Sequence, residues 1–161
     1  MSDAVTWKCV EFHALTPAEL YSVLQLRQRV FVVEQKCAYL DADGIDSACL
    51  HLMGWANTAS SEEISSRTRA LVAYARLIPP GVKFPKASIG RVATHPAWRG
   101  IGLGKELMAQ AMDQARKQGW NHQLMIQAQS YLEPFYEGFG FQRVSEPYVE
   151  DGIRHVDMIV E

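Results

Sequence analysis

Three glycines at alternate positions constrain this chain more than any other feature of its sequence. They stand in the segment Arg99-Gly-Ile-Gly-Leu-Gly-Lys105, between an apolar run that ends at Thr94 and a segment with helical periodicity. Glycine lets the backbone turn tightly and brings amide N–H groups close to a ligand. A helix that starts there adds unpaired N–H donors and the positive end of its dipole. The segment therefore predicts a strand, a tight turn and a helix that together bind an anion such as a pyrophosphate.

The rest of the chain alternates strand-like and helical segments. Thr16-Pro-Ala-Glu19 is typical of a helix start, and this first helix is expected to run to about Val30. The run at 31–35 that follows is rich in β-branched residues and strand-like. Strands are also expected at 7–13, 50–56, 70–78, 87–94 and 123–128, with a closing pair at 141–144 and 155–160 around a turn at 150–152, and helices at 103–119 and 132–138. The polar stretch 57–69 is expected to be a mobile connection.

This order of elements predicts one α/β domain over residues 1–161 with a mixed sheet. The first three strands are joined by short or polar links, which favours an antiparallel meander. The fourth and fifth strands are joined through a helix, and such a crossover makes them parallel or splayed. We therefore expect a mostly antiparallel sheet with helices on both faces.

Composition excludes several classes of function. A net charge of −2 gives no electrostatic reason to expect nucleic acid or an anionic membrane as a partner. No apolar run approaches the roughly 20 residues that span a bilayer, and residues 1–7 lack the features of a signal peptide. Cys9, Cys37 and Cys49 lack Cys-x-x-Cys spacing, so we expect a cytoplasmic protein with free thiols and no metal site. The acidic stretch 41–46 has its glycine at the fourth position counted from Asp41, whereas a calcium-binding EF-hand loop needs glycine at the sixth, so a calcium site is disfavoured.

The glycine segment does not fit the common nucleotide-binding loops. The dinucleotide pattern Gly-x-Gly-x-x-Gly would need glycine where Lys105 stands. The P-loop pattern would need glycine at Arg99 and Ser or Thr at Glu106. A nucleotide-binding function is thus disfavoured, and a glycine turn required by geometry alone remains an alternative.

The remaining pattern, Arg99-x-x-Gly102-x-Gly104, resembles the signature of the GNAT superfamily of acyl-CoA-dependent N-acyltransferases. That signature is Gln or Arg, two residues, Gly, one residue, and Gly or Ala. Phe135-Tyr136 ahead of Gly138-Phe139 resembles an aromatic–Tyr pair in the next crossover of such proteins, and the expected strand order agrees with the GNAT fold. The chain is more narrowly similar to the ElaA-like subgroup through Arg27-x-x-Val-Phe-Val-Val-Glu-Gln35, Asp41-x-Asp-Gly-x-Asp46, Gly90-Arg-Val92, Ala128-Gln129 and Glu150-Asp-Gly-Ile-x-His155.

This resemblance implies acetyl-CoA as cosubstrate. It places the coenzyme A pyrophosphate beside Arg99, on the backbone amides of Gly100, Ile101, Gly102, Leu103, Gly104 and Lys105. The pantetheine arm would pair with Val92 and Thr94, and a backbone N–H near Val92 or Ala93 would polarise the thioester carbonyl. Gln129 and Phe135 would contact the arm.

The resemblance also implies a general acid, while the base stays open. Tyr136 occupies the position that commonly gives a proton to the departing thiolate, although a Tyr beside Phe135 is also typical of core packing. Many GNAT enzymes carry a carboxylate on the fourth strand, but residues 88–94 contain none. The base candidates are then Glu34, Asp43, His51, Glu150, His155 or a chain of water molecules. Candidate acceptor-site residues are Asp43, His51, Arg76 and His155, with Arg91 beside them. His51 and His155 lie in strand-like segments, where a core or surface histidine is the more common case, and Arg76 and Arg91 are equally compatible with solvated strand positions.

We therefore expect acetyl transfer to a primary amine by direct attack in a ternary complex. No cysteine lies in a recognisable nucleophile setting, which disfavours an acyl-enzyme. The alternatives are a catalytically silent acyl-CoA-binding or sensor module, and an acyltransferase similar to acyl-homoserine lactone synthases, which the Arg27-x-x-Val30-Phe31 stretch faintly resembles. The acceptor could be a small polyamine, an amino sugar, a peptide N-terminus or a lysine. GNAT proteins are often dimers, which makes a homodimer a further expectation.

Overall fold

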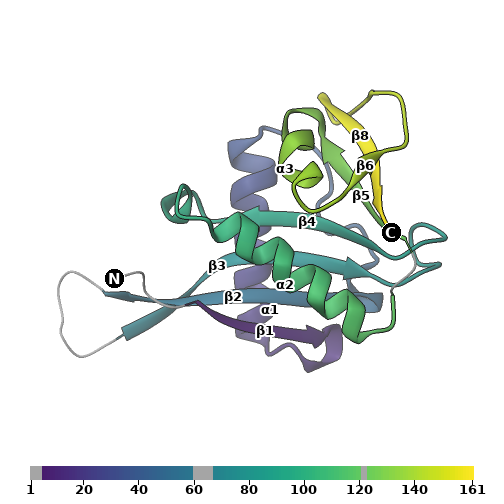
Figure 1. Ribbon diagram of the computed structural model, residues 1–161. Coiled ribbons are helices and arrows are strands. Elements are labelled where there is room, and N and C mark those ends of the chain that lie inside the picture. The colour runs from purple at the N-terminus through teal and green to yellow at the C-terminus, as the bar shows by residue number, and fades with distance from the viewer. Residues whose placement is uncertain (1–4, 60–66, 121–122) are drawn as a thin grey trace.

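A twisted mixed sheet forms the centre of the computed structural model, which describes residues 5–59, 67–120 and 123–161 (Figure 1). Within these residues eight strands follow the order β1-β2-β3-β4-β5-β8-β6, and β7 pairs with β8. The strands are β1 (Thr6–Glu11), β2 (Leu50–Ala59), β3 (Arg67–Ile78), β4 (Ser88–Thr94), β5 (Leu124–Gln129), β6 (Gln142–Arg143), β7 (Tyr148–Glu150) and β8 (Ile153–Val160). The helices are α1 (Pro17–Arg27), α2 (Leu103–Lys117) and α3 (Glu133–Glu137), with a π-helical segment η2 (Gln28–Glu34) after α1. The expected mixed α/β fold is confirmed.

The sheet is antiparallel except where β4 and β5 run parallel. These two strands pair at only two positions, Ser88 with Met125 and Ile89 with Ile126. On its other edge β5 pairs with β8 along its whole length, from Leu124 to Gln129. The expected splay of the fourth and fifth strands is therefore confirmed, and it opens the sheet toward the carboxyl end of β4.

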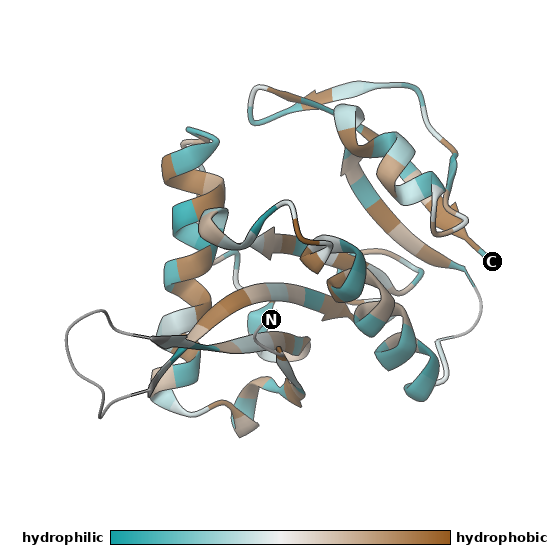
Figure 2. Ribbon diagram, turned by 60° about the vertical axis from the view of Figure 1, so that its left-hand side comes forward, coloured by the Kyte–Doolittle hydropathy of each residue, from teal (hydrophilic) through white to brown (hydrophobic). Residues whose placement is uncertain are grey.

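Two hydrophobic layers cover the opposite faces of the sheet. On one face α2 packs Leu107, Ala111 and Ala115 into a core that also includes residues of α3 and of the central strands. On the other face α1 packs Val23 and Leu26 against a smaller core. Figure 2 shows the hydrophobic residues concentrated along the central strands and on the sides of the helices that face them. No helix in the described ranges combines the length and apolarity needed to cross a membrane.

The strand-like interpretation of residues 31–35 was wrong. Residues 28–34 continue α1 as a wide turn, in which the Gln35 N–H donates to the Val30 carbonyl at 3.0 Å. Val30 is buried against the α1 core, whereas Val33 is exposed. The helical conformation packs Val30 into this core, and that packing outweighs the preference of the β-branched residues for a strand. The predicted start of α1 is confirmed, because Thr16 and Glu19 form a reciprocal capping box.

Two connections also differ from the expectation. The polar stretch 57–69 is in part strand, since β2 extends to Ala59 and β3 begins at Arg67; the rest of it, 60–66, lies outside the described residues. The expected pairing of 141–144 with 155–160 is confirmed, because β6 pairs with β8 at Gln142 and Arg143. β7, which the sequence pattern had not indicated, also pairs with β8 across the turn at Asp151-Gly152. β7 has only three residues, and the added parts of β2 and β3 are polar. Both properties weaken the alternation of apolar and polar residues on which the prediction relied.

Candidate active site

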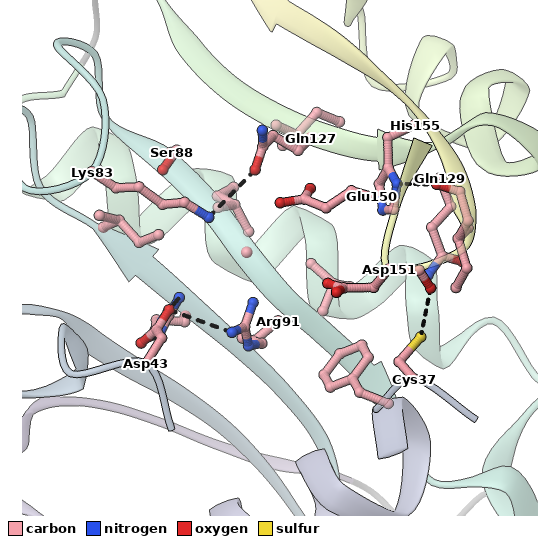
Figure 3. Close-up of a pocket in the computed structure, with 18 of the residues that line it drawn as sticks. Cys37, Asp43, Lys83, Ser88, Arg91, Gln127, Gln129, Glu150, Asp151 and His155 are labelled. Atoms are coloured by element: carbon pink, nitrogen blue, oxygen red, sulfur yellow. Dashed lines mark hydrogen bonds and ion pairs between the residues drawn. The ribbon is translucent and has the colours of Figure 1, made fainter. Parts of the chain in front are cut away.

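A cavity of about 350 Å³ opens where β4 and β5 part. Leu132 and Tyr136 line it from the face of the sheet that carries α3. Arg76 and Arg91, together with the connection that follows η2, line it from the other face. Figure 3 shows side chains from β4, β5 and the β7–β8 turn directed into this space. The cavity thus reaches both faces of the sheet through the gap between two strands.

The glycine turn before α2 has the geometry that its sequence predicts. Gly100 and Gly102 both have φ of +84°, which L side chains rarely adopt, and Gly102 is the N-cap of α2. The first helical hydrogen bond runs from the Glu106 N–H to the Gly102 carbonyl at 3.1 Å. The amides that precede it have no partner inside the helix, and they form the donor end expected for an anion site. A Cβ on Gly102 would meet no atom within 4 Å, so backbone conformation rather than crowding requires glycine there.

Arg99 and Glu34 tie this turn to η2. The Arg99 guanidinium donates to both Glu34 carboxylate oxygens, one of them at 3.1 Å, and to the Thr94 carbonyl at 3.0 Å. Glu34 does not line the cavity. A catalytic role for its carboxylate would therefore require this ion pair to open.

β4 contains a bulge at the point where it borders the cavity. Gly90 pairs with Arg76 and Ala93 pairs with Tyr74, so two residues of β4 lie opposite one residue of β3. Arg91, the first of the two, has φ of +51°. A bulge of this kind interrupts the ladder and leaves a backbone group unpaired. Val92, the next residue, lines the cavity, and its role as an oxyanion donor stays a prediction.

Tyr136 lies where the cavity meets the hydrophobic core. Its side chain lines the cavity, only 7% of the residue is exposed, and its ring packs edge-on against Phe135 and Phe141. Burial raises the pKa of Tyr136 to about 12, with a smaller contribution from Tyr131. The phenol therefore carries its proton at neutral pH, which is the state that a general acid needs.

Three arginines and three aspartates form a network of ion pairs beside the cavity, and we call them the Arg–Asp cluster. Its members are Arg27, Arg76, Arg91, Asp41, Asp43 and Asp46. Asp43, Arg76 and Arg91 line the cavity, and the other three members do not. Arg76 bridges Asp43 and Asp46 at 2.8 and 2.9 Å. Burial raises the pKa of Asp43 and of Asp46, but hydrogen bonds and charge from the arginines outweigh it and lower both pKa values. Because the charges balance, the acidic stretch 41–46 brings no excess negative charge to the cavity.

The four predicted acceptor-site residues do not all meet. Asp43, Arg76 and His155 line the cavity, whereas His51 lies outside it. The His51 ring is fully buried between the Tyr74 hydroxyl at 2.8 Å and the Asp46 carbonyl at 2.9 Å. Burial lowers the pKa of His51 more than its bond to Asp46 raises it. His51 thus packs as a neutral residue behind the Arg–Asp cluster.

The turn between β7 and β8 forms the wall opposite this cluster. Its residues Glu150 and Asp151 line the cavity, and the Cys37 thiol donates to the Asp151 carbonyl at 3.7 Å (Figure 3). His155 follows on β8, with Nδ1 at 2.8 Å from the Ile153 carbonyl. A carbonyl only accepts, so Nδ1 carries the hydrogen and Nε2 keeps a lone pair in the neutral ring. His155 therefore offers a basic nitrogen at the cavity.

Sequence reasoning missed several residues of the lining. Lys83, Ser88 and Gln127 were not singled out, and Cys37 was read only as a free thiol. Lys83 extends from the β3–β4 connection to Gln127, with Nζ at 3.3 Å from Oε1. A lysine after a Pro-Pro-Gly turn and a serine at a strand start are ordinary features, and no local signal distinguishes them. In the part of the chain that is described, no group of His, Cys, Asp and Glu is arranged to hold a metal ion.

Comparison with known proteins agrees with this geometry. Residues 53–161 match the family model of the acetyltransferase (GNAT) domain. A UPF0039 protein of Synechocystis is 41% identical over 155 residues, which cover 96% of this chain and 94% of that protein. Protein ElaA of Escherichia coli is 36% identical over 159 residues, covering 98% of this chain and 97% of that protein.

Solved structures give the same result. The crystal structure of an acyl-CoA N-acyltransferase from Pseudomonas aeruginosa superposes with a TM-score of 0.86 at 38% identity, covering 98% of this chain and 100% of that one. A coenzyme A-dependent acyl-homoserine lactone synthase superposes with a TM-score of 0.72 at 15% identity, covering 98% of this chain and 84% of that one. The second likeness shows a shared fold alone.

Proposed function

Because the chain belongs to the GNAT acetyltransferase family, with ElaA among its relatives, we propose that it transfers an acetyl group from acetyl-CoA to a primary amine. The observation that carries this proposal is the cavity that reaches both faces of the sheet between β4 and β5, with Tyr136 on its wall. Such a gap allows a thioester from one face and an amine from the other to meet beside β4. Reaction by direct attack in a ternary complex follows from this arrangement.

The donor side of the proposal uses the glycine turn and the open edge of β4. Backbone amides of residues 100–105 hold the pyrophosphate, and the backbone of Val92 and Thr94 pairs with the pantetheine arm. The fit rests on two features of the structure: the free amides at the start of α2 and the bulge that frees a backbone group of β4. Gln129 and Phe135 flank the arm; Gln129 lines the cavity, and the Phe135 ring packs against Tyr136.

The chemical step needs three groups at this junction. The neutral amine nitrogen attacks the thioester carbonyl carbon, and the backbone N–H of Val92 or Ala93 stabilises the developing oxyanion. As the carbon–sulfur bond breaks, Tyr136 donates its phenolic proton to the sulfur. An amide and free coenzyme A result, and the proton that the amine loses passes to a base.

The geometry favours His155 as that base over Glu34. Nε2 of His155 has a lone pair and lies at the cavity, whereas Glu34 lies outside its lining and is bound by Arg99. Glu34 would then act by fixing Arg99 beside the pyrophosphate site. Replacing His155 by Gln should lower kcat by about 10²-fold, while Glu34→Gln should act mainly on the KM for acetyl-CoA.

Release of coenzyme A, followed with a thiol reagent, tests the proposal directly. The purified protein is incubated with acetyl-CoA and polyamines, amino sugars, amino acids and short peptides. Release above hydrolysis with any of these amines supports the proposal. Binding of acetyl-CoA, measured by calorimetry, without release for any amine would favour the silent acyl-CoA-binding module. Lactone formation from a methionine-derived sulfonium substrate would favour the synthase-like alternative. The fold shared with a lactone synthase is the reason for testing this substrate.

A further inference from the structure

The cavity carries charges that the Arg–Asp cluster does not neutralise. The cluster contributes no net charge, because three arginines face three aspartates. The charged side chains that remain in the lining are Lys83 on the β3–β4 connection and Glu150 and Asp151 in the β7–β8 turn. Among the described residues none of these three forms an ion pair. The cavity therefore has a cationic end and an acidic end.

The cationic end holds polar groups that lack partners. Ser88 is only 2% exposed, and its hydroxyl has no hydrogen-bond partner among the described residues; the same holds for Nε of the buried Arg76. The pair of Ser88 with Ile78 and the pair of Arg76 with Gly90 are separated by one pair, Leu77 with Ile89, so both orphaned groups belong to the same stretch of the β3–β4 ladder. Leaving a buried polar group unpaired costs about 1–3 kcal/mol. A ligand oxygen that accepts from these groups would remove that cost.

Lys83 strengthens the preference of this end for an anion. Burial lowers the pKa of Lys83, and the positive charges of Arg91 and Arg76 lower it further, which outweighs the opposite effect of the Glu150 and Asp43 carboxylates. Three cationic side chains, Lys83, Arg76 and Arg91, thus share this part of the lining, and an anionic oxygen placed among them would be attracted. Gly90 adds room, because a Cβ at that position would meet only Ile78, at 3.7 Å.

The acidic end lies across the cavity, where the β7–β8 turn faces β4. Figure 3 shows the side chains of Glu150 and Asp151 extending into the cavity, beside the ring of His155. The Cys37 thiol contacts the backbone of this turn, at the Asp151 carbonyl. An ammonium group bound here would lie next to Nε2 of His155, the nitrogen proposed to take its proton.

We infer that the acceptor is a zwitterion: an amine that also carries a carboxylate, as amino acids do. Its amine binds at Glu150 and Asp151, and its carboxylate binds at Lys83, Ser88 and Nε of Arg76. A diamine would set a second cation against Lys83, and an acid without an amine would face two carboxylates. This inference rests on the proposed function and specifies its acceptor.

Matched pairs of acceptors test the inference. Each amino acid is compared with the amine formed by removing its carboxylate: lysine with cadaverine, ornithine with putrescine, histidine with histamine, and phenylalanine with phenethylamine. We expect kcat/KM for the amino acid to exceed that of its partner by about tenfold or more in the pairs that react, through a lower KM. Lys83→Met and Ser88→Ala should each remove most of this ratio. Lys86→Met, on the same connection but outside the lining, serves as the matched control and should preserve the ratio.

The outcomes separate the inference from the proposed function. Equal or better use of the decarboxylated amine in every reactive pair, or a ratio that Lys83→Met leaves intact, overturns the inference alone. Absence of coenzyme A release with every compound overturns the proposed function and the inference with it. Thermal unfolding of each variant, compared with that of the parent chain, separates loss of binding from loss of folded protein.

Discussion

Removal of Arg27 should destabilise this protein more than any substitution on its surface. The Arg27 side chain is fully buried and donates three hydrogen bonds, to Asp41 Oδ2 at 2.8 Å, to Asp46 Oδ1 at 2.7 Å and to the Asp41 carbonyl at 2.8 Å. Its guanidinium also lies over the ring of Tyr74. Arg27→Met keeps the apolar stem of the side chain but leaves three aspartates facing two arginines.

The expected loss follows from what the remaining partners can do. Breaking a buried ion pair by removing one member costs about 3–5 kcal/mol. Asp41 would keep its bond to Arg91 and Asp46 its bond to Arg76, so we expect the lower end, about 3 kcal/mol. With a urea m-value of about 2 kcal/mol/M, the unfolding midpoint should fall by about 1.5 M.

Urea unfolding followed by circular dichroism measures this loss. Arg29→Met is the matched control, because Arg29 is exposed two residues away and should change stability by no more than about 0.5 kcal/mol. Asp46→Asn added to Arg27→Met restores the balance of charge and should recover about 1 kcal/mol. A midpoint for Arg27→Met within the range of the Arg29→Met control would refute the view that the Arg–Asp cluster holds this wall of the cavity.

Three further predictions follow from the site. Tyr136→Phe should lower kcat by about 10²-fold with little change in the Kd for coenzyme A, measured by calorimetry; an unchanged kcat would exclude Tyr136 as the acid. Gly102→Ala forces a side chain into a left-handed conformation at a cost of about 1–2 kcal/mol and should weaken coenzyme A binding. Gly104→Ala is the control: its Cβ makes ordinary contact with Phe135, 3.8 Å away, so its unfolding midpoint should stay near that of the parent chain. If Gly102→Ala binds coenzyme A as tightly as the parent chain, the turn does not have the proposed role. Stability should fall as pH drops below about 4, because the arginines lower the pKa of Asp46 below its unfolded value and that stabilisation is lost as the carboxylate is protonated. Asp46→Asn should flatten this fall in urea midpoints measured between about pH 5 and pH 2, and an equal slope would show that other groups cause it.

The sequence by itself determined the features that depend on local backbone chemistry. Glycines at 100, 102 and 104 specify a turn before a helix, since Gly100 and Gly102 take positive φ, and Thr16 with Glu19 specifies a helix start. The crossover through α2 specifies that β4 and β5 run parallel, because a helix between two strands returns the chain in the same direction, whereas their splay was expected from the family resemblance. These local rules, together with the family resemblance, predict the fold and the glycine turn.

Tertiary structure alone decided which side chains meet at the cavity. The stretch 41–46 is acidic in the sequence, yet its charge is cancelled by Arg27, Arg76 and Arg91, which come from three separate elements. Lys83, Ser88 and Glu150 converge because the splay of β4 from β5 opens a space that the β3–β4 connection and the β7–β8 turn both border. Burial and charge balance are sums over neighbours distant in the chain, and no pattern within a single segment contains them.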